Sequence, residues 1–122
     1  MRKTILSAML ISGLAAPALA DSYPVSGEWG QSTSSAEGAI NCSNRRVIGF
    51  NDGQRTDSRG GVPAYRNKSV TPAGPSSYRI VDVFTNGQIN NAQAVYTLRL
   101  VDNDHIELQM QPGGTLKLQR CE

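Results

Sequence analysis

Residues 94–118 read AVYTLRLVDNDHIELQMQPGGTLKL, and this stretch decides the fold. Apolar and polar side chains alternate in three short runs, which is the pattern of strands with one buried face. Residues 102–104 (DND) separate the first run from the second, and residues 112–114 (PGG) separate the second from the third. These residue types favour tight turns. The stretch therefore predicts a three-stranded antiparallel meander.

Three shorter runs farther upstream also read as strands, at about residues 28–31, 46–50 and 78–84. After residue 20, no stretch keeps an apolar helical face without an interrupting glycine or proline. Six short strands in about a hundred residues predict an all-β antiparallel domain. Such a sheet is expected to close or curl, because closure removes its exposed edges. We expect a small up-and-down barrel or a strongly curled sheet of about six to eight strands, closed by one disulfide.

The first twenty residues predict a secretory signal peptide. Arg2 and Lys3 precede an apolar run over residues 5–16, and residues 18–20 (ALA) offer small side chains where a signal peptidase cleaves. The run holds roughly a dozen residues, whereas a bilayer-spanning helix needs about twenty. We therefore expect a monomeric single domain, residues 21–122, without membrane insertion, in the bacterial periplasm or secreted from the cell.

Cleavage of this leader makes the chain electrically neutral. Removing Arg2 and Lys3 from the twelve basic residues leaves ten, equal to the ten acidic residues. A neutral domain has no general field to attract phosphate backbones or anionic lipid. Nucleic acid is therefore excluded as a partner, and an unknown protein or small ligand is expected instead.

Cys42 and Cys121 are the only cysteines. In an oxidising compartment, an even pair of cysteines in a small domain forms a structural disulfide. Closing a ring of about 80 residues would stabilise the fold by about 4 to 5 kcal/mol in the loop-entropy model. Two cysteines and one histidine are too few for a zinc site, so we expect no metal and no cofactor.

A long polar segment, residues 51–77, separates two of the predicted strands and contains four glycines and three prolines. This length exceeds an ordinary connection in a compact domain. The segment has a local excess of two positive charges, and it predicts either a mobile solvated loop, with or without one short extra strand, or a binding loop. The candidate binding residues are Arg55, Arg59, Tyr65, Arg66 and Lys68.

Residues 26–29 (SGEW) and residues 118–121 (LQRC) together resemble the ends of the lipocalin or calycin superfamily pattern. The resemblance implies a barrel whose first-strand tryptophan closes one end, with an arginine of the last strand lying across its ring. It assigns structural roles to Gly27, Trp29 and Arg120. Arg120 also keeps the parity of the apolar positions in its strand, so its guanidinium can stack on the indole and contribute roughly 1 to 2 kcal/mol.

The same SGEW opening is similar to that of bacterial periplasmic inhibitors of secreted metalloproteases, which are small disulfide-bonded barrels. Those inhibitors insert an N-terminal trunk into the protease cleft. Residues 21–25 or the long polar segment would be the counterpart of this trunk here. Their disulfide is short-range, whereas Cys42 and Cys121 span most of the mature chain.

The only histidine, His105, lies beside Asp102 and Asp104 at a predicted turn. No nucleophile motif accompanies it, and turn chemistry explains these polar residues. We therefore assign no catalytic residue. The sequence predicts an exported non-enzymatic binding module of lipocalin-like type, and the alternative is a periplasmic inhibitor of a protease or lysozyme.

Arg45 and Arg46 form the only paired arginines of the chain. They could bind an anion if both side chains faced the same way. Adjacent residues of a strand face opposite ways, so the pattern predicts two solvated rim residues instead.

Overall fold

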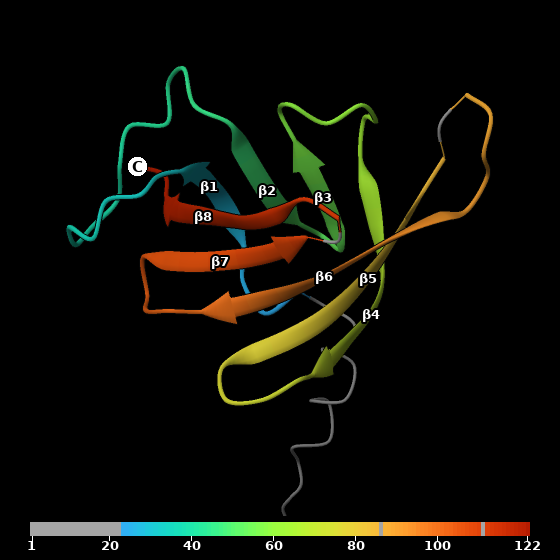
Figure 1. Cartoon of the computed structure of the whole chain (residues 1–122). Coiled ribbons are helices and arrows are strands. Elements are labelled where there is room, and N and C mark those ends of the chain that lie inside the picture. The colour runs from blue at the N-terminus through green and yellow to red at the C-terminus, as the bar shows by residue number, and fades with distance from the viewer. Residues whose placement is uncertain (1–22, 86, 111) are drawn as a thin grey trace, which may run out of the picture.

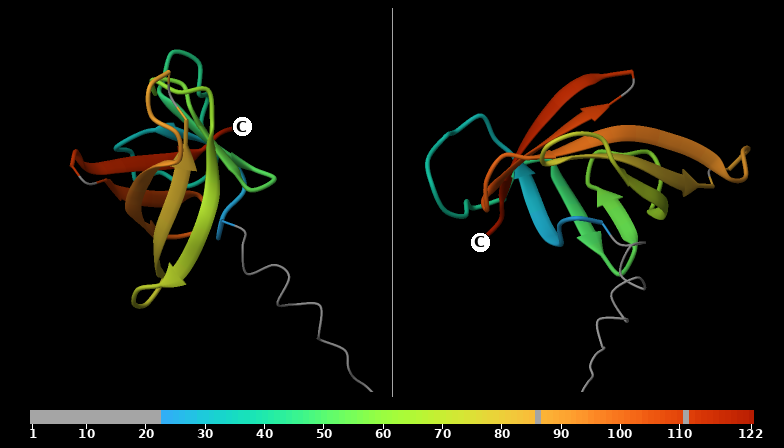
Figure 2. Two further views of the ribbon diagram at one scale, coloured as in Figure 1. Left: turned by 90° about the vertical axis from the view of Figure 1, so that its right-hand side faces the viewer. Right: turned by 90° about the horizontal axis from the view of Figure 1, so that it is seen from below.

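The computed structural model describes residues 23–85, 87–110 and 112–122, so the signal peptide predicted over residues 1–20 lies outside the described residues. In the described ranges the chain folds into eight antiparallel strands, each paired with the next, and β8 pairs with β1 to close a barrel (Figures 1 and 2). The strands are β1 Gly27–Gln31, β2 Val47–Asn51, β3 Gln54–Asp57, β4 Tyr65–Pro72, β5 Ser77–Phe84, β6 Ala92–Leu100, β7 His105–Met110 and β8 Gly114–Arg120. The predicted all-β fold is confirmed as a closed barrel.

Within the described ranges, no helix has the length and apolar character needed to cross a bilayer.

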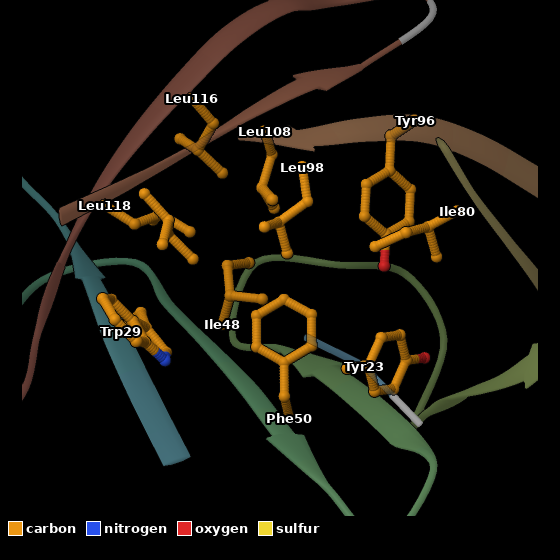
Figure 3. Packing of buried hydrophobic residues seen from close by; sticks show 11 residues of the cluster. Tyr23, Trp29, Ile48, Phe50, Ile80, Tyr96, Leu98, Leu108, Leu116 and Leu118 are labelled. Atoms are coloured by element: carbon orange, nitrogen blue, oxygen red, sulfur yellow. The ribbon is translucent and has the colours of Figure 1, made fainter. Parts of the chain in front are cut away.

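Eleven buried side chains fill the barrel interior as one hydrophobic cluster (Figure 3). The alternation predicted from the C-terminal meander accounts for six of them, because every second residue of these three strands points inward. The cluster comprises Tyr23, Trp29, Ile48, Phe50, Ile80, Tyr96, Leu98, Ile106, Leu108, Leu116 and Leu118.

All six predicted strands are present, but the prediction of a single polar loop over residues 51–77 is wrong. This segment contains β3 and β4, which complete the barrel wall. The inward positions of these strands include the polar residues Arg55 and Asn67 as well as Tyr65 and Val70, so the usual apolar alternation is interrupted. A β-bulge between Asn67 and Ser69 interrupts it further, because two residues oppose one on the partner strand.

The β2–β3 turn explains why a strand can begin so soon after Asn51. Asp52 and Gly53 both have positive φ, at 53° and 76°. A two-residue hairpin loop of this kind matches the twist of the flanking strands, and Asp-Gly is a preferred sequence for it. The turn places Asn51 opposite Gln54.

The barrel has two ends with different connections. At the end where β1 begins and β8 ends, which we call the closed end, the N-terminal segment meets the β2–β3, β4–β5 and β6–β7 turns. The opposite end, which we call the loop end, carries the β1–β2, β3–β4, β5–β6 and β7–β8 connections (Figure 1). The β1–β2 connection, residues 32–46, is the longest of these.

Candidate functional site

Trp29 and Arg120 meet at the closed end, as the sequence predicts. They are register partners of β1 and β8. Trp29 is 1% exposed, and the guanidinium carbon of Arg120 lies 4.5 Å from the centre of its ring system. The indole Nε1 donates a hydrogen bond to the carbonyl oxygen of Ser26 at 3.1 Å, and Gly27 has a φ of 87°, which favours glycine. This contact therefore joins the first strand to the last.

Tyr23 closes the same end from inside. Its ring is buried and lies edge-on to Phe50, with 4.9 Å between the ring centroids. Its hydroxyl donates a hydrogen bond to Asp82 Oδ1 at 2.8 Å. The segment that leads into β1 is thereby held against the barrel. A surface recess of about 550 Å³ remains beside it, lined in part by Val25 and Leu100.

The β1–β2 connection is fastened to the barrel wall. The predicted disulfide between Cys42 and Cys121 is present. The side-chain amide of Gln119, which is 1% exposed, donates hydrogen bonds at 3.0 Å to the carbonyl oxygens of Ala36 and Gly38. The connection therefore runs back along the outside of β8.

Arg55 is not a solvated binding residue, which corrects the prediction. It is 1% exposed inside the barrel, and its Nε lies 2.8 Å from Asp82 Oδ2. The hydroxyls of Tyr96 and Tyr23 each donate to the same carboxylate at 2.8 Å, and Asn67 Nδ2 donates at 3.2 Å. Four donors thus converge on Asp82, which satisfies a buried charge that would otherwise be costly.

Aromatic rings surround this polar centre. The guanidinium carbon of Arg55 lies 3.9 Å from the ring centroid of Tyr65 and 4.8 Å from that of Tyr96. Burial lowers the pKa of Arg55, but its contacts with Tyr96 and Asp82 outweigh burial and raise the pKa overall. Burial raises the pKa of both Tyr23 and Tyr96, and the nearby Asp82 carboxylate raises it further. The two hydroxyls therefore stay protonated, and the centre is suited to holding the barrel together rather than to moving protons.

The other predicted binding residues do not form one surface with Arg55. Tyr65 begins β4 and is half-buried, with its ring edge-on to Phe84 at 5.1 Å. Arg66 and Lys68 are exposed on β4, and Arg59 is exposed in the β3–β4 connection at the loop end. The structure therefore divides the predicted set between the interior, the wall and one end.

His105 is paired with Asp102, and the distance between Nδ1 and Oδ1 is 2.8 Å. The hydrogen bond from His105 lowers the pKa of Asp102. His105 Nε2 is buried and has no hydrogen-bond partner among the described residues. The residue His105 helps to line a pocket of about 200 Å³, together with Ser32 and Lys117. Within the described ranges, no three histidine, cysteine or acidic residues gather as a group able to hold a metal ion.

Sequence reasoning missed the polar centre, although one signal pointed to it. Asp82 is the only charged residue between Ile80 and Phe84, in a run that otherwise reads as a fully buried strand. A carboxylate in such a position needs a buried donor. Its partners come from distant parts of the chain, so the sequence could not identify them.

Comparisons with protein-family models, with curated proteins and with solved structures found no match for this chain.

Proposed function

We propose that the protein is an exported, non-enzymatic binding module of lipocalin-like type that takes its ligand or partner at the loop end. The stacking of Arg120 on Trp29 at one end of an eight-stranded antiparallel barrel carries this proposal. It matches the end closure that the resemblance implies. It leaves the opposite end, with its longer connections, as the variable surface of the fold.

The filled interior supports binding at the rim rather than deep inside the barrel. The hydrophobic cluster occupies one part of the interior, and the Arg55–Asp82 centre occupies another. An eight-stranded barrel is just wide enough for its own side chains to fill. A ligand is therefore expected to contact connections and rim residues.

The position of Tyr23 favours a binding module over a trunk-inserting inhibitor. Tyr23 is 9% exposed and its hydroxyl donates a hydrogen bond to Asp82, so the described part of the N-terminal segment packs on the barrel. An inhibitor of the kind that the resemblance suggests would need this segment to protrude.

Two matched insertions test the proposal. A short Gly-Ser insertion between Gly60 and Gly61 changes the loop end, and the same insertion between Gly74 and Pro75 changes the closed end. All four residues are exposed in connections, where insertions are tolerated. The protein, expressed from the full sequence and purified from the periplasm, is immobilised and exposed to periplasmic extract and culture medium.

We expect a ligand or partner to be captured by the unaltered protein and by the closed-end insertion, and lost with the loop-end insertion. Thermal unfolding of both insertion proteins controls for misfolding. Capture that survives the loop-end insertion and disappears with the closed-end insertion would contradict the proposal.

A further inference from the structure

A pocket of about 340 Å³ at the loop end brings three arginines together. Arg45, Arg46 and Arg59 line it with uncharged residues that include Ser32, Thr33 and Asn44, and none of its described lining residues is acidic. The sequence predicts that Arg45 and Arg46 point to opposite sides. This prediction is wrong, because both residues line the same pocket. Strand β2 begins only at Val47, so both arginines precede the strand and strand alternation does not apply to them.

Arg45 is held in place without being neutralised. Its Nε donates to the carbonyl oxygen of Asn41 and its Nη1 to that of Gln31, each at 3.0 Å. Carbonyl oxygens fix the guanidinium but carry no net charge, and an arginine has five N–H donors. The remaining donors are available to a ligand.

The disulfide stiffens the turn that carries Arg45. The backbone N–H of Arg45 donates to the carbonyl oxygen of Cys42 at 3.2 Å, and Asn44 has a φ of 63°. Cys42 itself packs on Gly30, where an added Cβ would come within 2.5 Å of its Sγ. The turn is therefore tied to β1 as well as to Cys121.

Arg46 and Arg59 are organised by one buried carboxylate. Arg46 binds Asp57 through two hydrogen bonds, at 3.0 Å from Nε and 2.7 Å from Nη2. The backbone N–H of Arg59 donates to Asp57 Oδ1 at 3.0 Å. The Asp57 side chain is only 4% exposed, so it lies beneath the pocket rather than in it. Three cations against this one anion leave the pocket with an excess of two positive charges.

We propose that this arginine pocket binds a phosphate monoester group. Such a group carries a charge of about −1.5 to −2 at neutral pH and three acceptor oxygens. These features match the excess charge and the donors that remain on the three guanidinium groups, which include Nη2 of Arg45 and Nη1 of Arg46. A carboxylate offers only two acceptor oxygens and a single negative charge, so it matches the pocket less well. The inference rests on the proposed function, since it names the ligand chemistry recognised at the loop end.

Titration calorimetry with phenyl phosphate tests this inference directly, with inorganic phosphate and benzoate as comparison ligands. Phenyl phosphate should bind the purified protein, and benzoate should bind at least about tenfold more weakly because it lacks the third oxygen. Inorganic phosphate that binds as well as phenyl phosphate would identify the free ion as the source of the group. Weaker binding of inorganic phosphate would identify an organic ester.

Arg45→Ala and Arg59→Ala should each weaken phenyl phosphate binding about tenfold or more, because each removes charge-assisted hydrogen bonds. Arg79→Ala is the matched control, since Arg79 is exposed on β5 and does not line the pocket. The Arg79→Ala protein should bind phenyl phosphate with the same affinity as the unaltered protein. The Arg59 side chain projects from an exposed connection, so the melting temperature of Arg59→Ala should not change.

Absence of phenyl phosphate binding, or equal affinity in Arg59→Ala and the unaltered protein, would overturn the inference. If capture of a ligand or partner still depends on the β3–β4 connection in that case, only the phosphate assignment fails. If capture is also insensitive to that connection, the proposed function fails with it.

Discussion

At the closed end, Arg120 lies over the Trp29 ring and also donates from Nε to the carbonyl oxygen of Asn103 at 3.2 Å. At the loop end, Arg45 is held by carbonyl oxygens alone, and within the described ranges no ion pair joins Arg45 or Arg59 to a carboxylate. Arginine therefore has a different role at each end of the barrel. A guanidinium stacked on a buried ring closes the barrel, whereas fixed guanidiniums beside a pocket present donors to a ligand.

The largest effect should come from the polar centre that lies between these ends. Asp82→Ala would leave Arg55 buried without its carboxylate and remove the acceptor of two tyrosine hydroxyls. We expect a loss of about 5 kcal/mol in the free energy of unfolding, near the upper end for a broken buried ion pair. Chemical denaturation measures it. The double variant Asp82→Leu with Arg55→Met should recover part of the loss, and a loss below about 1 kcal/mol for Asp82→Ala would show that the pair is hydrated.

The closed end should show the next largest effect. Trp29→Ala should lower the free energy of unfolding by about 4 kcal/mol as a large core truncation. Arg120→Ala should lower it by about 1 kcal/mol, because its side chain is 44% exposed and such stacking is modest at exposed sites. The two losses should not add in a double-mutant cycle. Additive losses, or fluorescence of this only tryptophan close to that of free indole in water, would show that the contact does not form.

Removing the disulfide should affect both ends, because Cys42 lies in the turn of Arg45 and Cys121 follows Arg120. Cys42→Ser with Cys121→Ser should lower the free energy of unfolding by about 3 kcal/mol. The same variant, studied at a temperature where it is folded, should bind phenyl phosphate more weakly because the Arg45 turn is less constrained. Unchanged phosphate affinity would mean that the hydrogen bonds of Arg45 alone fix the turn.

The smallest effect concerns Asp57 at the loop end and depends on pH. Burial raises its pKa, but hydrogen bonds from Arg46 and from the backbone of Arg59 outweigh burial and lower the pKa below its usual range. A carboxyl whose folded pKa is lowered stabilises the fold above its unfolded pKa of about 3.9 and loses that contribution as the pH falls through the folded pKa. Asp57→Asn should therefore be less stable than the unaltered protein by about 1 kcal/mol at neutral pH.

The difference between these two proteins should shrink as the pH falls below about 4, the ordinary pKa of the carboxyl, because the unfolded state then binds protons more readily than the folded state. Urea denaturation at a series of pH values measures this difference in the free energy of unfolding. A constant difference across this range would contradict the assigned pair.

The sequence predicted the strands whose inward positions are apolar. It did not predict β3 and β4, where polar residues occupy some of the inward positions. Leu98 and Leu108 belong to strands that the alternation of apolar and polar residues predicts. Arg55 and Asn67 point inward just as these leucines do, yet they read as loop residues until their partner Asp82 is known. The local Asp52–Gly53 pair carried the hairpin signal that would have revealed β3.

The two ends of the barrel also differed in how far the sequence could predict them. Trp29 and Arg120 could be paired from a resemblance and a parity argument, since both lie in regular strands. Arg45, Arg46 and Arg59 could not be grouped, because their geometry depends on a turn set by Cys42 and on a carboxylate eleven residues from Arg46. Long-range contacts that fix irregular backbone leave no periodic pattern in a sequence.

The most direct test of the account is a nuclear magnetic resonance titration of the ¹⁵N-labelled protein with phenyl phosphate. It follows the arginine Nε–H signals of both ends and the Trp29 indole N–H in one experiment. We predict that the signals of Arg45, Arg46 and Arg59 shift in a saturable way, while those of Trp29 and Arg120 stay in place. Shifts centred on Trp29 and the neighbouring recess at the closed end, with the loop-end arginines unmoved, would contradict the account.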